Sequence, residues 1–247
     1  PHLVDGSGCV EQARAVKSAP ELAYMRDAAQ ITDAGIAAAI AETCPGATEN
    51  DLAAAAFAAM TRAGSEWMAK DPIVTTGDRA GIPHTTYMGR ALKPGDTVLL
   101  EFSAVKHRYF APLMRSGWLG QLDPRMRAWP DICQEALETA ISCCRPGVNA
   151  GEVDAQCRAV IENHQCWLHY RKRAGYSVGI GFASWIEGAI STMRDDYATV
   201  LQPGMCFHIP VAMRLYGEGT VGISQTVVVT ENGAKPLHAA PAEFFVR

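Results

Sequence analysis

Two residues in the first half of the chain have the types needed for acid–base chemistry. His84 lies in a loop rich in glycine and proline, and Glu101, 17 positions later, ends an apolar run at 98–100. An imidazole exchanges protons near neutral pH, and a nearby carboxylate can act as a base or a nucleophile. A carboxylate in an apolar strand is costly to bury unless it has a task or a partner. We predict that His84 and Glu101 form a reactive pair; the alternative for Glu101 is a salt bridge with Arg108 or Arg115.

A repeated pattern indicates how these residues are positioned. Residues 92–101 (LKPGDTVLLE) are echoed 109 positions later by residues 201–210 (LQPGMCFHIP), and residues 44–48 are echoed 101 positions later by residues 145–149. In the first pair, each copy is a Pro-Gly turn followed by an apolar strand, which ends in a carboxylate in one copy and in a proline in the other. The repeat predicts a duplicated α/β half-domain with a site between the halves.

The local patterns predict helices and strands in the same order in both halves. Ser18 and Glu21 form a capping box at the start of the first helix, and Thr48 caps the second. Residues 3–4 suggest a strand remnant, and 77–81 a loop. We predict helices at 20–40, 51–63, 124–144 and 151–164, and strands at 72–75, 97–105, 108–114, 175–181, 205–213 and 221–230, with a hairpin turn at 106–107.

Composition excludes several classes of function. The net charge of the 247 residues is −4, and charges of both signs are spread along the chain, so we expect no nucleic-acid partner. No apolar run approaches the roughly 18 residues of a membrane span, so we expect no membrane partner. The eight cysteines form no CxxC pair, which favours reduced, buried thiols in a cytoplasmic protein.

The chain contains four distinctive segments, at residues 17–21, 92–96, 175–181 and 201–205. Together they resemble the pita-bread family, which includes creatinase, proline and methionine aminopeptidases, and ectoine hydrolase. The resemblance implies an α/β (α+β) fold of duplicated halves with a curved, mostly antiparallel sheet covered by helices. It also implies a catalytic domain at 17–247, a remnant strand and linker of an N-terminal domain at 1–16, and a homodimer. His84 matches the family's loop histidine, which assists proton transfer.

The same resemblance bears on metal binding. The two metals of the family's peptidases are held by two aspartates, a histidine and two glutamates. Those five positions fall here on Glu101, Pro112, Tyr176, Pro210 and Ser224. Proline offers no side-chain ligand, and the hydroxyls of tyrosine and serine are poor substitutes for imidazole and carboxylate. From the sequence we therefore expect no metal, no other cofactor and no metallopeptidase activity.

Among the metal-free members, the chain looks more similar to ectoine hydrolase than to creatinase, whose guanidinium-binding glutamates match Met114 and Ser224 here. The resemblance to ectoine hydrolase rests on residues 107–113 and 175–182 and on a glutamate at position 101. It implies a metal-independent hydrolase that cleaves a C–N bond in a small cyclic amidine or amide. Glu101 would be the nucleophile or base and His84 the general acid/base. The candidate substrate-binding residues are Tyr176, His208, Arg115 and Trp185.

Two alternatives remain open at this point. Gly222 and Gln225 stand where we expect acidic residues in the ectoine branch, and the loop around Trp185 also departs from it. These departures suit a catalytically inactive pita-bread binding module for a peptide or small molecule. The other alternative is a creatinase-like amidinohydrolase.

Overall fold

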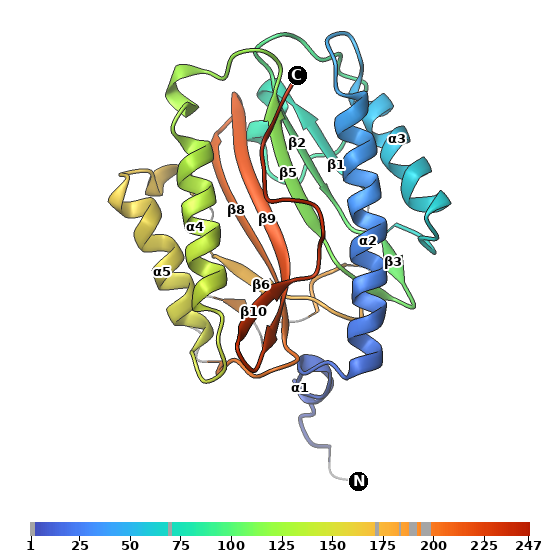
Figure 1. The fold of residues 1–247 in the computed structure, drawn as a ribbon, viewed down its shortest axis with the longest axis vertical. Helices are drawn as coiled ribbons and strands as arrows, with labels where there is room; N and C mark the ends of the chain where they lie inside the picture. Colours follow the sequence, from blue (N-terminus) through green and yellow to red (C-terminus); the bar gives the residue numbers. More distant parts are fainter. Residues whose placement is uncertain (1–2, 69–70, 171–172, 183, 188–191, 194–198) are drawn as a thin grey trace.

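A computed structural model describes residues 3–68, 71–170, 173–182, 184–187, 192–193 and 199–247 (Figure 1). Its centre is a nine-stranded sheet whose main path runs in the order β1-β2-β5-β9-β8-β6-β7. Along the described chain, no helix is long and apolar enough to cross a membrane. The helices are α1 (Cys9–Ala15), α2 (Ala19–Glu42), α3 (Glu49–Arg62), α4 (Trp129–Cys143) and α5 (Ala150–Asn163). The strands of the path are β1 (Ile73–Thr76), β2 (Thr97–Phe102), β5 (Leu113–Trp118), β9 (Gly219–Thr230), β8 (Cys206–Leu215), β6 (Gly175–Ser177) and β7 (Thr192–Met193).

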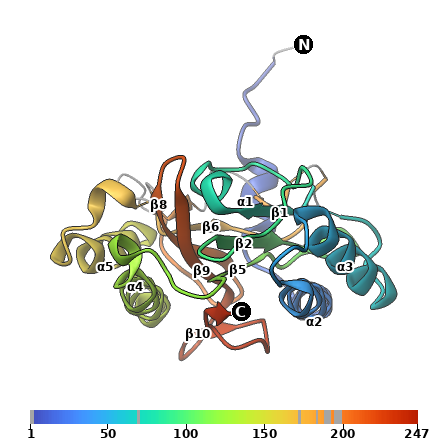
Figure 2. The same cartoon turned by 90° about the horizontal axis from the view of Figure 1, so that it is seen from above.

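Helices α2 to α5 lie on one face of the sheet, as the view from above shows (Figure 2). Strand residues alternate between the faces, so Leu100 and Phe102 pack under α2 and α3, while Leu99 points the other way. Leu99 and Met114 pack with Ala80 of the short helix η1 (Gly77–Gly81) on the face away from the helices. We call this second surface the site face.

The predicted duplication is confirmed by matching turns. Gly46 donates its backbone N–H to the carbonyl of Leu92 at 3.0 Å, and Gly147 donates to Leu201 at 2.9 Å. Each Pro-Gly turn before a helix is thus tied to the Pro-Gly turn before a strand of the same half. The α/β class and the mostly antiparallel, curled sheet are also as predicted.

The two halves meet where β5 pairs with β9. Two serine hydroxyls contribute to this seam alongside the backbone ladder. Ser224 Oγ accepts the N–H of Met114 at 2.7 Å, and Ser116 Oγ accepts the N–H of Gly222 at 2.8 Å. The Ser116 hydroxyl also donates to the carbonyl of Gly222 at 2.8 Å. Side chains of one half therefore bond the backbone of the other.

Several local predictions were wrong. Residues 77–81 form the 3-10 helix η1 where a loop was expected, and β6 ends at Ser177, before the predicted end at 181. The chain between β2 and β5 forms a separate two-stranded ribbon, β3 (Val105–Lys106) with β4 (Tyr109–Phe110), in place of one long hairpin. His107 and Arg108 have φ angles of 48° and 67°, and two successive left-handed residues suit a tight two-residue turn that ends the strand early. Residues 9–15 form α1, where a strand and linker were expected. Their origin in a further domain stays a prediction.

The C-terminal residues return to the sheet on the helix side. β11 (Phe245–Val246) pairs in parallel with β5, and β10 (Gly233–Pro236) pairs with β9. Phe245 lies so close to Gly117 that a Cβ added there would overlap the Phe245 carbonyl. Gly117 is thus required by the approach of β11.

Replacing Gly117 by alanine should lower the free energy of unfolding by about 1–3 kcal/mol, because the methyl group forces β11 away from β5. Urea denaturation measures the loss. Gly6→Ala is the control, because the space around Gly6 is open. An unchanged midpoint for Gly117→Ala would contradict the packing described here.

Candidate active site

A row of side chains crosses the site face from β2 to β6. Glu101 on β2 pairs with Met114 on β5, whose amide bonds the hydroxyl of Ser224 on β9. His208 on β8 pairs in register with Tyr176 on β6. The row therefore brings together residues from both halves, as the repeat predicted.

Four side chains toward the β6 end of the row form a continuous hydrogen-bonded chain. The indole N–H of Trp185 donates to the Tyr176 hydroxyl at 2.8 Å. That hydroxyl bonds Nδ1 of His208 at 2.7 Å, and Nε2 of His208 bonds the hydroxyl of Ser224 at 2.7 Å. All four side chains are buried. Such a satisfied, buried network fixes each member's orientation.

The hydrogen-bonded chain of these four side chains allows two arrangements of its protons. If Tyr176 donates to Nδ1, then Nε2 of His208 carries a proton and donates to Ser224, whose own proton points outside the chain. If Ser224 donates to Nε2, the directions reverse and the outward proton belongs to Tyr176. The four residues can therefore hold a proton at either end of the chain, on β6 or on β9.

Tyr176→Phe should lower the free energy of unfolding by about 1–3 kcal/mol, because it removes the acceptor of the Trp185 indole and a partner of the His208 ring. Chemical denaturation followed by circular dichroism measures the effect. Tyr216→Phe is the control, because that side chain is 78% exposed. Equal stability of the two variants would show that the chain of hydrogen bonds contributes little.

Glu101 lies on the site face between Ile73 of β1 and Met114 of β5 and is 2% exposed. Neither salt bridge considered from the sequence is present. Arg108 lies between two aromatic rings, 4.8 Å from the centroid of Trp67 and 4.4 Å from that of Phe182.

Arg115 does not belong to the site, which corrects its prediction as a substrate-binding residue. It pairs with Leu100 and so lies on the helix side of the sheet. Its guanidinium donates to the carbonyls of Met114 at 2.9 Å, Ser224 at 2.7 Å and Pro241 at 2.8 Å. Burial lowers its pKa to about 10. Arg115 thus holds the C-terminal segment against the sheet.

His84 is exposed in the loop that follows η1, and its φ of 60° is in the left-handed region. A non-glycine residue in that conformation has to be held by its surroundings. The Thr85 hydroxyl bonds the carbonyl of Ile82 at 3.2 Å, and the Thr86 hydroxyl bonds that of Pro72 at 2.8 Å. Because η1 packs on the site face, this loop belongs to the same side as Glu101.

The loop is anchored by Glu49, in the first turn of α3. This carboxylate is completely buried and forms a salt bridge with Arg79 of η1. It also accepts the N–H of Thr76 at 3.0 Å and the N–H of Met88 at 2.9 Å. One side chain therefore fixes both ends of the segment that carries His84.

A second buried ion pair supports the other end of the row. Lys17 Nζ lies 2.5 Å from the carboxylate of Glu187, and both side chains are almost fully buried. Glu187 follows Trp185 by two residues, so the pair ties the loop that carries the indole to the start of α2. Burial raises the pKa of Glu187, and the charge of Lys17 opposes that shift.

The residues at the five family ligand positions do not fit a pair of metal ions. Pro112 and Pro210 have no side-chain donor, and the Pro112 carbonyl already accepts the hydroxyl of Thr226 at 2.7 Å. The hydroxyls of Tyr176 and Ser224 belong to the hydrogen-bonded chain. Within the described ranges, no group of three or more His, Cys, Asp or Glu side chains could hold a metal.

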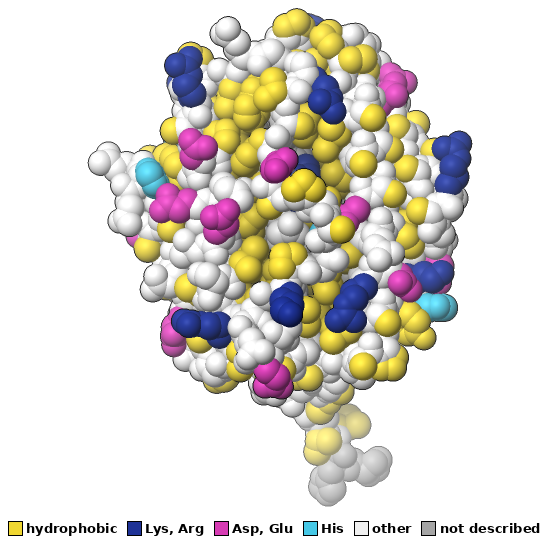
Figure 3. Space-filling view, in the orientation of Figure 1, with side chains coloured by type: hydrophobic (Ala, Val, Ile, Leu, Met, Phe, Trp, Pro, Cys, Tyr) yellow, Lys and Arg dark blue, Asp and Glu magenta, His cyan; other side chains and the backbone are white. Residues whose placement is uncertain are grey.

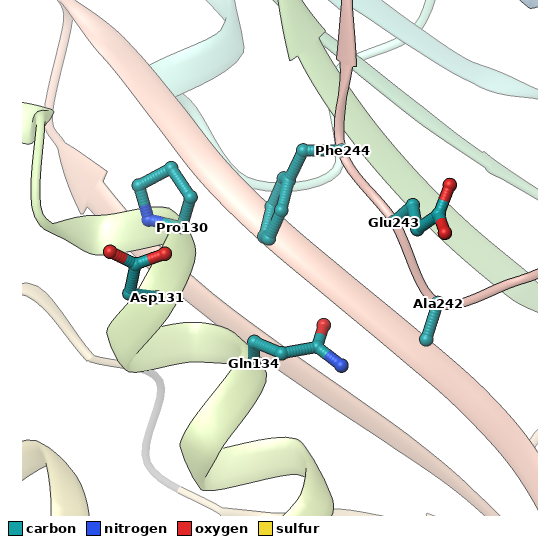
Figure 4. A pocket seen from close by; sticks show the side chains of 6 residues that line it. All are labelled: Pro130, Asp131, Gln134, Ala242, Glu243 and Phe244. Carbon is teal, nitrogen blue, oxygen red and sulfur yellow. The ribbon is translucent and has the colours of Figure 1, made fainter.

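A separate hollow lies on the helix side, with a volume of about 450 Å³. Figure 4 shows Phe244 directed toward α4 and Glu243 directed away from it. In the space-filling view, hydrophobic side chains gather in this region and charges of both signs are interspersed elsewhere on that face (Figure 3). The hollow is remote from the row because the sheet separates them. Its lining residues are Pro130, Asp131, Gln134, Ala242, Glu243 and Phe244.

Comparison with known proteins agrees with this architecture. Residues 23–231 match the model of metallopeptidase family M24, and the chain belongs to that family. It is 32% identical to the hydrolase/peptidase y4tM of Sinorhizobium fredii, over 98% of this chain and 62% of that protein. It is 29% identical to a Xaa-Pro dipeptidase of Pyrococcus furiosus, over 92% of this chain and 64% of that protein. The chain thus spans less than two thirds of these curated relatives.

A solved structure gives the same result. The prolidase from Pyrococcus furiosus superposes with a TM-score of 0.90 at 28% identity, covering 96% of this chain and 68% of that chain. The pita-bread fold expected from the sequence is therefore confirmed.

The comparisons overturn the metal-independent, ectoine-type assignment. Ectoine hydrolase of Halomonas elongata is similar at 27% identity, but several relatives of equal or greater similarity are named dipeptidases. The matching family is one of metallopeptidases, so the prediction that excluded the chain from that class was wrong.

Of the predicted site residues, Tyr176, His208 and Trp185 are brought into direct contact, and Glu101 shares their face. Two contributors were missed. Ser224 was considered only as a position where related proteins carry a glutamate, and its place opposite Pro210 follows from the strand register alone. Glu49 gave no signal, because its partners lie 27 to 39 residues away in sequence.

Proposed function

We propose that this chain is a hydrolase of the M24 family that cleaves the amide bond of a short peptide, with dipeptides that end in proline as the first class to test. The observation that carries the proposal is the row from Glu101 to Tyr176 on the site face, in a fold shared with prolidases. The names of similar proteins, Xaa-Pro dipeptidase and prolidase, supply the substrate class. A homodimer, expected from the family resemblance, is part of the proposal.

Residues of the chain can be given roles in this proposal. The loop of His84 places an imidazole on the side of the row, where it can protonate a departing nitrogen. The hydrogen-bonded chain of four side chains, which runs from the Trp185 indole to the Ser224 hydroxyl, presents a fixed hydroxyl to the bound peptide group. It can hold a proton at either end. The donor set does not fit the metals that the family name implies, so no step is assigned to them.

The test is release of proline from alanyl-proline and glycyl-proline by the full chain, after chelator treatment and after addition of manganese chloride. We expect proline release, reduced about 100-fold or more in kcat/KM by His84→Ala. His107→Ala is the matched control, because His107 is also exposed with a positive φ but lies at the tip of the β3–β4 ribbon. No proline release under either condition would overturn the proposal.

A further inference from the structure

Arg108 is held more firmly than an ordinary surface arginine. It is exposed in the turn of the β3–β4 ribbon, and its guanidinium carbon lies 4.8 Å from the ring centroid of Trp67 and 4.4 Å from that of Phe182. We call these three side chains the Arg108 stack. Among the described residues, no hydrogen bond or ion pair reaches the guanidinium. The rings therefore hold the cation by cation–π contact and leave its N–H groups available.

The backbone around the turn fixes both sides of the Arg108 stack. The φ angle of Arg108 is 67°, and its carbonyl accepts the N–H of Gly181 at 3.0 Å, one residue before Phe182. On the other side, the carboxylate of Glu66, the residue before the indole, accepts the N–H of His107 at 3.0 Å. The acidic group next to the stack is therefore bonded to the turn and does not neutralise the guanidinium.

The Arg108 stack lies at the β6 end of the row. Trp67 packs against the buried cluster that contains Tyr176 and Trp185. Phe182 precedes Trp185 by three residues, and three residue steps span at most about 11 Å. An extended dipeptide is about 7 Å long. A short ligand that lies along the row can therefore reach the guanidinium with one end.

The chemistry of the Arg108 stack fits a carboxylate. A guanidinium offers paired N–H donors that match the two oxygens of a carboxylate, and a neutral amide has only one such oxygen and no charge. At an open surface this contact is weak, because water solvates both groups. Two rings over the guanidinium remove part of that water and hold the cation in one place, so the contact becomes stronger and more selective.

We propose that the Arg108 stack is a carboxylate subsite that selects which ligands bind along the row. This inference rests on the proposed function for the class of ligand, a short peptide, but it concerns binding and not cleavage. A short peptide carries a carboxylate at its C-terminus or in an acidic side chain. Both sources present the same group to the guanidinium, and the two pairs of probes described next distinguish them.

Isothermal titration calorimetry with the full chain measures affinity for dipeptide analogues whose ketomethylene group cannot be hydrolysed. The first pair is the alanyl-proline analogue and its C-terminal carboxamide, and the second is the glutamyl-proline and glutaminyl-proline analogues. In at least one pair, the acid should bind at least tenfold more tightly than the amide, and that pair identifies the source. Arg108→Met should reduce this ratio to less than twofold. Arg127→Met, which removes an exposed arginine just before α4, should keep it.

Two further variants separate recognition from folding. Arg108→Lys keeps the charge without the paired donors, and Phe182→Leu removes one ring of the stack. Each should give a ratio between those of the unaltered chain and Arg108→Met, with an unchanged circular dichroism spectrum. If Arg108→Met does not fold, these two variants decide the result.

Several outcomes would overturn the inference. These are no binding of any probe at millimolar concentration, a ratio below twofold in both pairs, a ratio that the changes at Arg108 and Phe182 leave intact, or one that also collapses in Arg127→Met. Cleavage of alanyl-proline with equal affinity for acids and amides would leave the proposed function standing and remove the subsite. Carboxylate-selective binding without cleavage would leave the subsite alone.

Discussion

Glu49→Ala is expected to lower the free energy of unfolding by about 3–5 kcal/mol, because it leaves the cation of Arg79 partly buried without its partner. The variant also removes the acceptor of two backbone N–H groups, those of Thr76 and Met88. Urea denaturation followed by circular dichroism measures the loss. Glu49→Gln should cost less, since the amide oxygen keeps one acceptor.

The control is Glu42→Ala, which changes an exposed glutamate in the last turn of α2 and should leave the denaturation midpoint unchanged. A loss below about 1 kcal/mol for Glu49→Ala would mean that the loop does not depend on this anchor. If the proposed function holds, the variant should also lower kcat more than it raises KM, because it disturbs the position of His84, the residue that protonates the departing nitrogen.

Lys17→Met should lower the free energy of unfolding by about 3–5 kcal/mol at pH 7.5, and by less at pH 5. The charge of Lys17 opposes the effect of burial on Glu187, so its removal raises the pKa of Glu187 further. A carboxyl group whose pKa is higher in the folded state than in the unfolded state stabilises the fold at low pH. This stabilisation is lost as the pH rises from the unfolded-state pKa through the folded-state pKa. In the variant the folded-state pKa of Glu187 is higher still, so this pH range extends upward. Protonation of Glu187 at pH 5 then removes its buried charge.

Urea denaturation at the two pH values checks the result, with Lys93→Met at an exposed site as the control. The double variant Lys17→Met/Glu187→Leu should recover most of the loss, because it leaves no buried charge. A loss that is independent of pH would show that Glu187 is not the group responsible.

Much of the architecture could be predicted from local sequence. The Ser18–Glu21 and Thr48–Asp51 capping boxes are present in the structure, and the Pro-Gly turns fix the start of the repeated strands. Helix α4 begins at Trp129, later than predicted, because the residues before it form a loop and a short 3-10 helix, η2 (Pro124–Met126). Patterns that are satisfied within a few residues were therefore the reliable ones.

The candidate residues of the site could be chosen one by one from the sequence, but their arrangement could not. Tyr176, Trp185 and His208 were chosen separately, and their direct contact depends on the pairing of β6 with β8. Arg115 was misplaced for the same reason. Whether it shares a face with Glu101 is decided by the register of β2 against β5, which pairs Glu101 with Met114. A shift of one residue would reverse the faces, and no short-range pattern fixes it.

The seam between β5 and β9 has a consequence for motion. Within each half, long runs of paired backbone groups must open together, as in the ten register pairs of β8 with β9. At the seam, the N–H groups of Met114 and Gly222 are held by serine hydroxyls, which can rotate away without separating the strands. Amide hydrogen exchange should therefore divide the sheet into two cooperative units, with these two amides exchanging before either unit opens.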